Sequence, residues 1–176
     1  IENGLSAARA LPGRFEPIVA GQDFAVIVDY AHTPDALENV LTEARHLASG
    51  KVICVVGCGG DRDRAKRPVM GEISTRLADS TVFTSDNPRT ENPELILDDI
   101  IAGARSGNQF DRIEKRGAAI RSAVSHARPG DVVVIAGKGH EPYQEIGHTK
   151  HPYDDRDEAR MALAEMISSN SEQVRR

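Results

Sequence analysis

The sequence has few cysteines and no long apolar run. Its two cysteines, Cys54 and Cys58, have a spacing that fits neither a CxxC redox motif nor a zinc ribbon. No apolar stretch approaches the roughly 20 residues of a membrane-spanning helix, and residues 1–10 lack the pattern of a signal peptide. We therefore expect a reduced, cytoplasmic protein with no membrane partner.

Charge of one sign is also scarce. The formal net charge is −5, with acidic and basic residues interspersed, so neither a basic face for nucleic acid nor a charged tail is expected. No internal repeat or low-complexity linker divides the chain. A chain of 176 residues, 39% of them apolar, can build one well-packed domain, and its partners are expected to be small molecules.

Strand and helix patterns alternate along the chain. Short apolar runs predict buried strands at 24–30, 51–57, 81–85 and 131–137. Weaker patterns predict two further strands at 110–114 and 143–146. Helical patterns between them have recognisable caps, with Thr33 before Pro34 and Asn92 before Pro93. This alternation predicts an α/β, Rossmann-like, doubly wound and mostly parallel sheet of about six strands flanked by helices.

The apolar positions of the first two helices predict which side chains face the core. In the helix after Thr33 the expected stripe runs from Ala36 and Leu37 to Leu47 and Ala48. The next helix is expected to bury Val69, Ile73 and Leu77. Alanine-rich residues 118–127 predict a further helix, and a last one begins near Asp154 or Asp155.

Four polar loops follow the predicted strands: DYAHTPD, GCGGDRDRAKRP, SDNPRTENP and AGKGHEP. Ligands of open parallel sheets bind at the carboxyl ends of the strands, so these loops predict one binding cleft. The spacing of GCGGDR and AGKGHEP matches neither GxGxxG nor a P-loop, and we assign no triphosphate chemistry to either.

The cations of these loops each have two interpretations. Arg62 precedes a helix amino end, where a positive charge is best explained by a visiting anion. Lys66 and Arg67 are expected to be a solvated helix start. Arg89, between two prolines, either clamps a ligand carboxylate or pairs locally with Asp86.

The remaining polar residues are similarly open. Asp29 ends an apolar strand and should be paired or face a cleft; His32 contacts a ligand or packs in its loop. Glu141 receives an ammonium group or accepts hydrogen bonds from its own loop, and Cys58 is a small turn residue because no partner base is apparent. Together, the cations Arg62 and Arg89 and the carboxylate of Glu141 predict a cleft for a small, zwitterionic and acidic ligand.

DYAHTPDALENVL, GCGGDRDRAKRPVMGEI, TSDNPRTENPELILDDI and IAGKGHEPYQEI, in this order and spacing, resemble the C-terminal domain of the Mur ligase family. The resemblance runs from about residue 13 to residue 160. It implies a cytoplasmic step of peptidoglycan synthesis in which ATP phosphorylates the D-glutamyl side-chain carboxylate of UDP-MurNAc-L-Ala-D-Glu. The amine of an incoming amino acid then attacks, leaving an amide, ADP and phosphate.

The resemblance also implies roles for single residues. DNPR, at 86–89, is associated with members that add meso-diaminopimelate, so Arg89 would hold the distal carboxylate of that amino acid. The full set of implied meso-diaminopimelate contacts is Arg62, Asp86, Asn87, Pro88, Arg89, Gly137 and Glu141. Asp29 and His32 resemble ATP contacts near the ribose and adenine. No catalytic residue and no metal ligand is assigned to this chain.

The resemblance implies domains that this chain does not contain. ATP and Mg²⁺ would have their principal sites in a central domain and the UDP-sugar in an N-terminal one, so this chain alone is expected to be inactive and to hold no cofactor tightly. We expect 1–17 to be an interdomain connection, 18–170 the amino-acid-binding domain and 171–176 a disordered tail. KRGAAI at 115–120 departs from the family's usual Asp-Arg pair.

Two other functions are considered. A lysine-adding ligase of the same family is the nearer one, and the DNPR motif argues against it. The other is a non-catalytic domain that senses an amino acid or a nucleotide, and the absence of a P-loop from this chain is compatible with it.

Overall fold

A six-stranded sheet forms the centre of the computed structural model, which describes the backbone of residues 11–174 and the side chains of residues 11–169. The strands of the sheet are β1 (Glu16–Pro17), β2 (Ala25–Asp29), β3 (Val52–Val56), β4 (Ser80–Phe83), β5 (Phe110–Arg112) and β6 (Val132–Ala136). Their order is β1-β2-β6-β3-β4-β5. β1 pairs antiparallel with β2 and every other pair is parallel, which confirms the predicted fold class.

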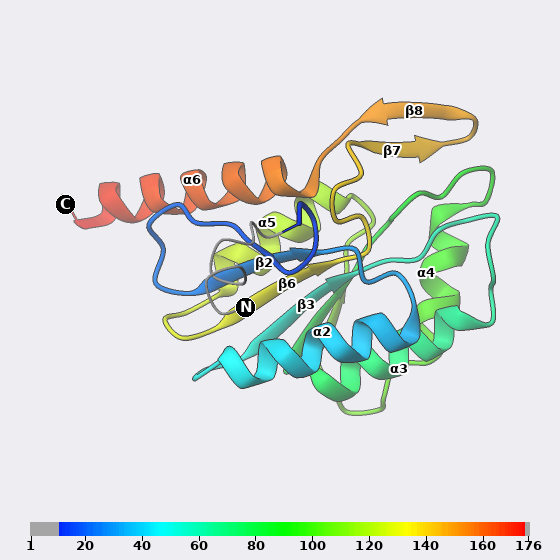
Figure 1. The fold of residues 1–176 in the computed structure, drawn as a ribbon, viewed down its shortest axis with the longest axis horizontal. Helices are drawn as coiled ribbons and strands as arrows, with labels where there is room; N and C mark the ends of the chain where they lie inside the picture. The colour runs from blue at the N-terminus through cyan, green and yellow to red at the C-terminus, as the bar shows by residue number, and fades with distance from the viewer. Residues whose placement is uncertain (1–10, 175–176) are drawn as a thin grey trace, which may run out of the picture.

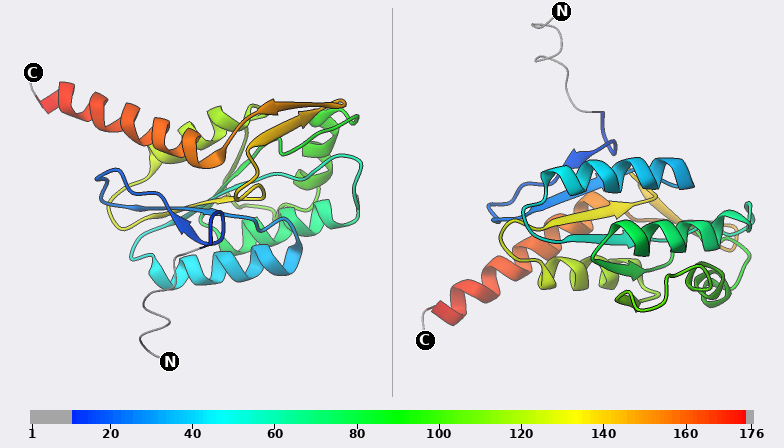
Figure 2. Two further views of the ribbon diagram at one scale, coloured as in Figure 1. Left: turned by 45° about the horizontal axis from the view of Figure 1, so that its top comes forward. Right: turned by 90° about the horizontal axis from the view of Figure 1, so that it is seen from below.

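Helices cover both faces of the sheet (Figures 1 and 2). The helices α2 (Pro34–Leu47), α3 (Lys66–Leu77) and α4 (Pro93–Ile101) pack on one face, and α5 (Arg116–His126) and α6 (Asp155–Val174) on the other. Side chains alternate along each strand as the pleat requires. Val52, Cys54 and Val56 of β3, for example, face the first group of helices, and the residues between them face the second.

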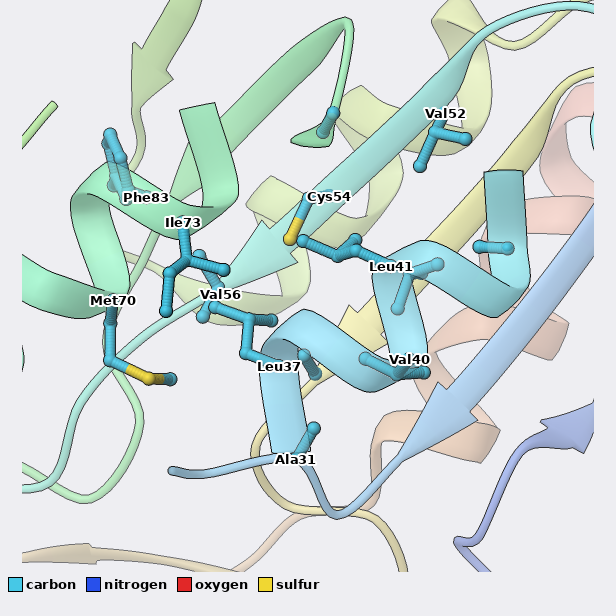
Figure 3. Packing of buried hydrophobic residues seen from close by; sticks show 14 of the residues in the cluster. Ala31, Leu37, Val40, Leu41, Val52, Cys54, Val56, Met70, Ile73 and Phe83 are labelled. Carbon is cyan, nitrogen blue, oxygen red and sulfur yellow. The ribbon is translucent and has the colours of Figure 1, made fainter. Parts of the chain in front are cut away.

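The larger core lies between the sheet and α2 and α3 (Figure 3). Leu37 and Leu41 from α2 and Met70 from α3 are fully buried there against the strands. Burying an aliphatic side chain of this size contributes about 1.5–3 kcal/mol. This packing holds the amino ends of both helices at the same edge of the sheet, where the predicted loops lie.

The predicted helix caps are confirmed, but two predicted core residues are exposed. Thr33 Oγ1 accepts from Ala36 N, and Asn92 Oδ1 accepts from Glu94 N. Leu47 is 61% exposed and Val69 45% exposed, because a helix turns by about 100° per residue. The buried stripes pass through Leu37–Val40–Leu41–Ala44 and through Met70–Ile73–Ser74, so Leu47 and Val69 project to their sides.

The ends of the predicted domain differ from the expected boundaries. Glu16 and Pro17 pair with β2, so the described part of the expected connection, 11–17, is already joined to the sheet. At the other end α6 continues to Val174, so 171–174 extend a helix. Residues 1–10 and 175–176 of the expected connection and tail lie outside the described residues.

A hairpin that the sequence suggested only in part stands beyond the sheet (Figure 1). The predicted strand at 143–146 is β7 (Tyr143–Ile146), and it pairs antiparallel with β8 (Thr149–Pro152), which was not predicted. Within the described residues, no helix has the length and apolar character needed to cross a membrane.

Candidate functional site

A cleft of about 480 Å³ opens at the carboxyl ends of β2, β3, β4 and β6. All four predicted loops contribute to its wall, which consists of Tyr30, His32, Thr33, Gly57, Cys58, Gly59, Arg62, Asp63, Lys66, Asp86, Asn87, Arg89, Gly137, Glu141 and Tyr143. The structure thus brings together seven of the nine predicted site residues. Pro88 and Asp29 are not among the wall residues.

Asn87 lies at the centre of the hydrogen bonds in the cleft. It is 3% exposed, and its Oδ1 accepts from Lys138 Nζ at 2.6 Å and from Glu145 N at 2.9 Å. Its Nδ2 donates to Glu141 Oε2 at 3.1 Å. The backbone oxygen of Asn87 accepts from Gly60 N at 2.8 Å, so this one residue connects the loops after β3, β4 and β6.

Arg89 has an unusual backbone conformation and is well anchored. Its φ is +49°, which is uncommon outside glycine and marks a constrained position. Arg89 N donates to Glu145 O and Gly147 N donates to Arg89 O, so β7 holds this backbone from both sides. The Arg89 side chain donates from Nε to Glu145 Oε2 and from Nη1 to Gly60 O.

The local ion pair expected for Arg89 is formed with a different partner. The ion-pair partner of Arg89 is Glu145, with 3.1 Å between Nε and Oε2, rather than the predicted Asp86. Nη2 makes no hydrogen bond with any described residue, and the side chain reaches the cleft wall. Arg89 therefore presents an anchored, partly unsatisfied guanidinium to the cleft.

Asp86 faces Gly137 across the floor of the cleft. Gly137 has a φ of +124°, and a Cβ there would lie 2.7 Å from Asp86 Oδ2, so a side chain at 137 would collide with the carboxylate. Behind Gly137, Arg116 forms a fully buried two-bond ion pair with Asp155, with both distances 2.7 Å. Burial opposes the charge of Arg116, but Asp155 raises its pKa.

Glu141 lies between Tyr30 and Asn87 in the wall of the cleft. Tyr30 Oη lies 3.4 Å from Glu141 Oε1, and burial together with Glu141 raises the pKa of Tyr30. The carboxylate of Glu141 is 3.8 Å from Lys138 Nζ. Glu141 is thus a half-buried anion with hydrogen-bond partners from two other loops, which a ligand ammonium group could approach.

The basic residues around the start of α3, from Arg62 to Arg67, have different surroundings. Arg62 is exposed at the cleft and forms no ion pair with a described residue. Arg67, expected to be solvated, is fully buried: its guanidinium donates to both oxygens of Glu91 and to Asp99. The hydrogen bonds from Arg67 hold the pKa of Glu91 at about 2, and this network fastens the loop after Arg89 to α3.

The two predicted nucleotide contacts lie in different surroundings. His32 is exposed on the cleft wall, and its ring centroid is 4.5 Å from that of Tyr30. Asp29 is half-buried, and its Oδ2 accepts from Phe15 N at 2.7 Å. The guanidinium of Arg14 lies over the ring of Tyr30, 4.6 Å from its centroid. The geometry therefore brings His32 into the cleft without Asp29.

Sequence reasoning missed several residues of the site, among them Tyr30, Lys138 and Glu145. Lys138 lay within a quoted loop, and its signal was a lysine directly after an apolar strand, where burial needs partners. Glu145 and Tyr30 had no comparable signal. Glu145 meets Arg89 only because the β7–β8 hairpin folds back over the loop after β4.

The chemistry of the cleft depends also on whether Cys58 is reactive and whether a metal ion can be held. Burial raises the pKa of the Cys58 thiol to about 12, so Cys58 is not an activated nucleophile. Among the described residues, no group of three or more histidine, cysteine, aspartate or glutamate side chains is arranged to hold a metal ion. The side chains of the cleft are suited to a charged organic ligand.

Comparison with known proteins shows the family of this chain. A family model described as "Mur ligase, glutamate ligase domain" matches residues 13–139. This chain belongs to the Mur ligase family. The matched range contains eight of the nine predicted site residues and ends just before Glu141.

Curated relatives of this Mur ligase domain are similar over nearly its whole length. A protein of Synechococcus elongatus named UDP-N-acetylmuramoyl-L-alanyl-D-glutamate--2,6-diaminopimelate ligase is 58% identical over 161 residues, 90% of this chain and 32% of the relative. A protein of the same name from Oceanobacillus iheyensis is 54% identical over 93% of this chain and 33% of the relative. The chain thus spans about a third of the length of these relatives.

A solved structure has the same fold and a related sequence. It is described as a UDP-N-acetylmuramoyl-L-alanyl-D-glutamate--2,6-diaminopimelate ligase and superposes with a TM-score of 0.84 at 43% identity. The match covers 94% of this Mur ligase domain and 34% of that chain. The arrangement of the sheet and its loops is therefore shared with a chain about three times as long.

Proposed function

We propose that this Mur ligase domain binds the incoming amino acid in an ATP-dependent ligase that adds meso-diaminopimelate to UDP-MurNAc-L-Ala-D-Glu. One observation carries the proposal: the same cleft is lined by two arginines, Arg62 and Arg89, and by two carboxylates, Asp86 and Glu141. An amino acid with an additional carboxylate needs this distribution of charge. The names of the relatives, at 54–58% identity, support the same substrate.

In this proposal Arg89 receives the distal carboxylate of meso-diaminopimelate. Its backbone is held by β7 and its Nε by Glu145, so the guanidinium is oriented before the ligand arrives. Pre-orientation of this kind lowers the entropic cost of binding. Arg62 contributes a second, more mobile cation, and Pro88 keeps the loop in shape.

Glu141 and Asp86 receive an ammonium group of the ligand. Both carboxylates lie on the floor or wall of the cleft, and Gly137 lets the ligand approach Asp86 because it has no side chain. The reacting amine is thereby held at a defined place and orientation, which is the main catalytic contribution of a substrate-positioning domain. No residue of the cleft is assigned as the general base.

ATP would supply the phosphoryl group that activates the D-glutamyl carboxylate, and Mg²⁺ would accompany it. His32 and Tyr30 place an imidazole and a phenol ring at the cleft, tilted by 60° to each other. Either ring could stack on an adenine, and Asp29 directly precedes Tyr30 at the end of β2. We propose that this domain closes over ATP held elsewhere in the complete ligase, in the cytoplasm.

A titration of the 15N-labelled chain tests the substrate assignment. We expect meso-diaminopimelate to shift the backbone amides of 60–64, 86–91 and 137–142 together, and L-lysine, which lacks the distal carboxylate, to leave 86–91 unshifted at the same concentration. Equal responses to both ligands would favour the lysine-adding alternative. Shifts with neither would mean that the cleft requires other domains or that the substrate is wrong.

A chimera separates a ligase domain from a sensor. The C-terminal third of the Synechococcus elongatus relative is replaced by this chain, and formation of the tripeptide product is measured with each amino acid. Activity with meso-diaminopimelate is expected. A folded chimera that binds UDP-MurNAc-L-Ala-D-Glu and ATP but forms no amide would contradict the catalytic role and favour a non-catalytic binding domain.

A further inference from the structure

Lys138 is a charged side chain that is completely buried at the floor of the cleft. Its ammonium donates to Asn87 Oδ1 at 2.6 Å and to Tyr143 O at 2.9 Å. Asp86 and Glu141 are further away, at 3.7 and 3.8 Å. Burial lowers the pKa of Lys138, and the two carboxylates oppose this effect. An ammonium in such a place requires partners, and the nearest of them is an amide rather than a carboxylate.

The contacts of Lys138 determine which way the amide of Asn87 points. Asn87 Oδ1 also faces Glu145 N at 2.9 Å, and both an ammonium and a backbone N–H can only donate hydrogen bonds. The atom that receives them must be the oxygen, because the amide nitrogen would be repelled by both. Nδ2 then faces Glu141, 3.1 Å from its Oε2. One of its two hydrogens is used there, and the other remains for a ligand.

We propose that Lys138 is a positioning residue that sets the substrate-binding orientation of Asn87, so that its Nδ2 holds Glu141 and donates to a carboxylate oxygen of the amino acid. The identity of that amino acid rests on the proposed function. The Lys138 ammonium is also close to the carboxylates of both Asp86 and Glu141, at 3.7 and 3.8 Å. Without the ammonium, Asn87 Oδ1 keeps only the backbone N–H of Glu145 as a donor, so the orientation of the amide is less strongly fixed.

A purely structural role makes a different prediction. Lys138 also ties the end of β6 to β7 through Tyr143 O, so its loss could weaken the hairpin without affecting Asn87. The orientation of the amide distinguishes the two roles, and NMR detects it directly from the side-chain NH2 signals of Asn87.

The first measurement uses the wild-type 15N-labelled chain without ligand. We expect nuclear Overhauser contacts from the Asn87 NH2 protons to the side chain of Glu141 and none to the amide of Glu145. The opposite pattern would overturn the proposal, and this result does not depend on any variant or on the substrate.

The second measurement compares Lys138→Met with Lys51→Met, a control at an exposed lysine outside the cleft wall. In Lys138→Met we expect the Asn87 NH2 signals to shift and lose their contacts to Glu141. The dissociation constant for meso-diaminopimelate should rise by about 10-fold or more, as for a lost hydrogen bond to a charged group. Lys51→Met should change neither.

A double-mutant cycle tests whether Lys138 acts through Asn87. The variant Lys138→Met/Asn87→Ala should bind meso-diaminopimelate within about 2-fold of Asn87→Ala alone, because the amide to be oriented is gone. Fully additive losses, or Asn87 signals that are unchanged in Lys138→Met, would contradict the proposal. If the wild-type chain binds no meso-diaminopimelate, the cleft requires other domains or the proposed substrate is wrong, while the amide signals still decide the role of Lys138.

Discussion

Arg62 and Arg67 come from one run of charge in the sequence, yet they belong to two different regions of the molecule. Arg67 is fully buried, with Glu91 and Asp99 as partners. Arg62 is exposed at the cleft and has no ion-pair partner among the described residues. The difference teaches that a paired, buried cation stabilises the frame of a site, whereas an unpaired cation at its wall is available to a ligand.

Arg89 lies between these extremes. Two of its nitrogens are engaged by Glu145 and Gly60, and the third is free of described partners. It is anchored as Arg67 is and accessible as Arg62 is. This combination fits a residue that must bind a carboxylate at a fixed position, because the geometry of a guanidinium is useful only when its base is held.

Removing Arg67 should have the largest effect, and it should fall on stability. Arg67→Ala leaves the carboxylates of Glu91 and Asp99, which are 18% and 43% exposed, without their buried partner. We expect a loss of about 3 kcal/mol, the lower end of the range for a broken buried pair. Urea unfolding of the chain measures the loss. Arg64→Ala is the control, because Arg64 contacts the same Glu91 at 3.0 Å but is 65% exposed. Equal losses in both variants would show that burial does not distinguish these arginines.

Removing Arg89 should affect ligand binding more than stability. Arg89→Ala deletes the oriented guanidinium, and we expect affinity for meso-diaminopimelate to fall about 100-fold, or ~2.7 kcal/mol. In the chimera, the KM for ATP should stay within about 2-fold, because ATP does not contact this residue in the proposal. The surface variant Arg112→Ala serves as control. Parallel increases in the two KM values would remove Arg89 from the amino-acid site.

Removing Arg62 should have a smaller effect of the same kind. Arg62→Ala takes away an exposed cation, so we expect a loss in meso-diaminopimelate affinity of about 10-fold, or ~1.4 kcal/mol, and a change in unfolding free energy within about 0.5 kcal/mol. Isothermal titration and urea unfolding measure the two quantities. Unchanged affinity would assign Arg62 to the solvated surface instead.

The smallest expected effect is a pH dependence of the Arg67 region. The pKa of Glu91 falls from 4.5 to about 2 on folding, so its contribution is complete above pH 4.5 and is lost as the pH falls towards 2. Between pH 7 and pH 3 the melting temperature should therefore decrease less in Glu91→Gln than in the wild type. The corresponding difference in unfolding free energy is about 1 kcal/mol or less after solvent screening. Identical pH profiles would mean that Glu91 is not the carboxylate concerned.

Much of the fold was predictable because its signals are local. The apolar runs of β2, β3 and β6, and the caps at Thr33 and Asn92, depend on neighbouring residues and were confirmed. Leu47 and Val69 were misplaced because apolar character alone does not locate the edge of a buried stripe. β8 was missed because its residues, TKHP, are polar and exposed.

Short segments encode the alternating α/β pattern, the four loops and the DNPR motif, so the order of amino acids predicts them. The pairing of charges depends on the folded chain. Arg67 donates hydrogen bonds to Glu91, 24 residues away in the sequence. Lys138 donates to Asn87 across 51 residues, and Arg89 to Glu145 across 56. Partners so distant along the chain are selected by the order of the strands and the packing of the helices, which no single segment encodes.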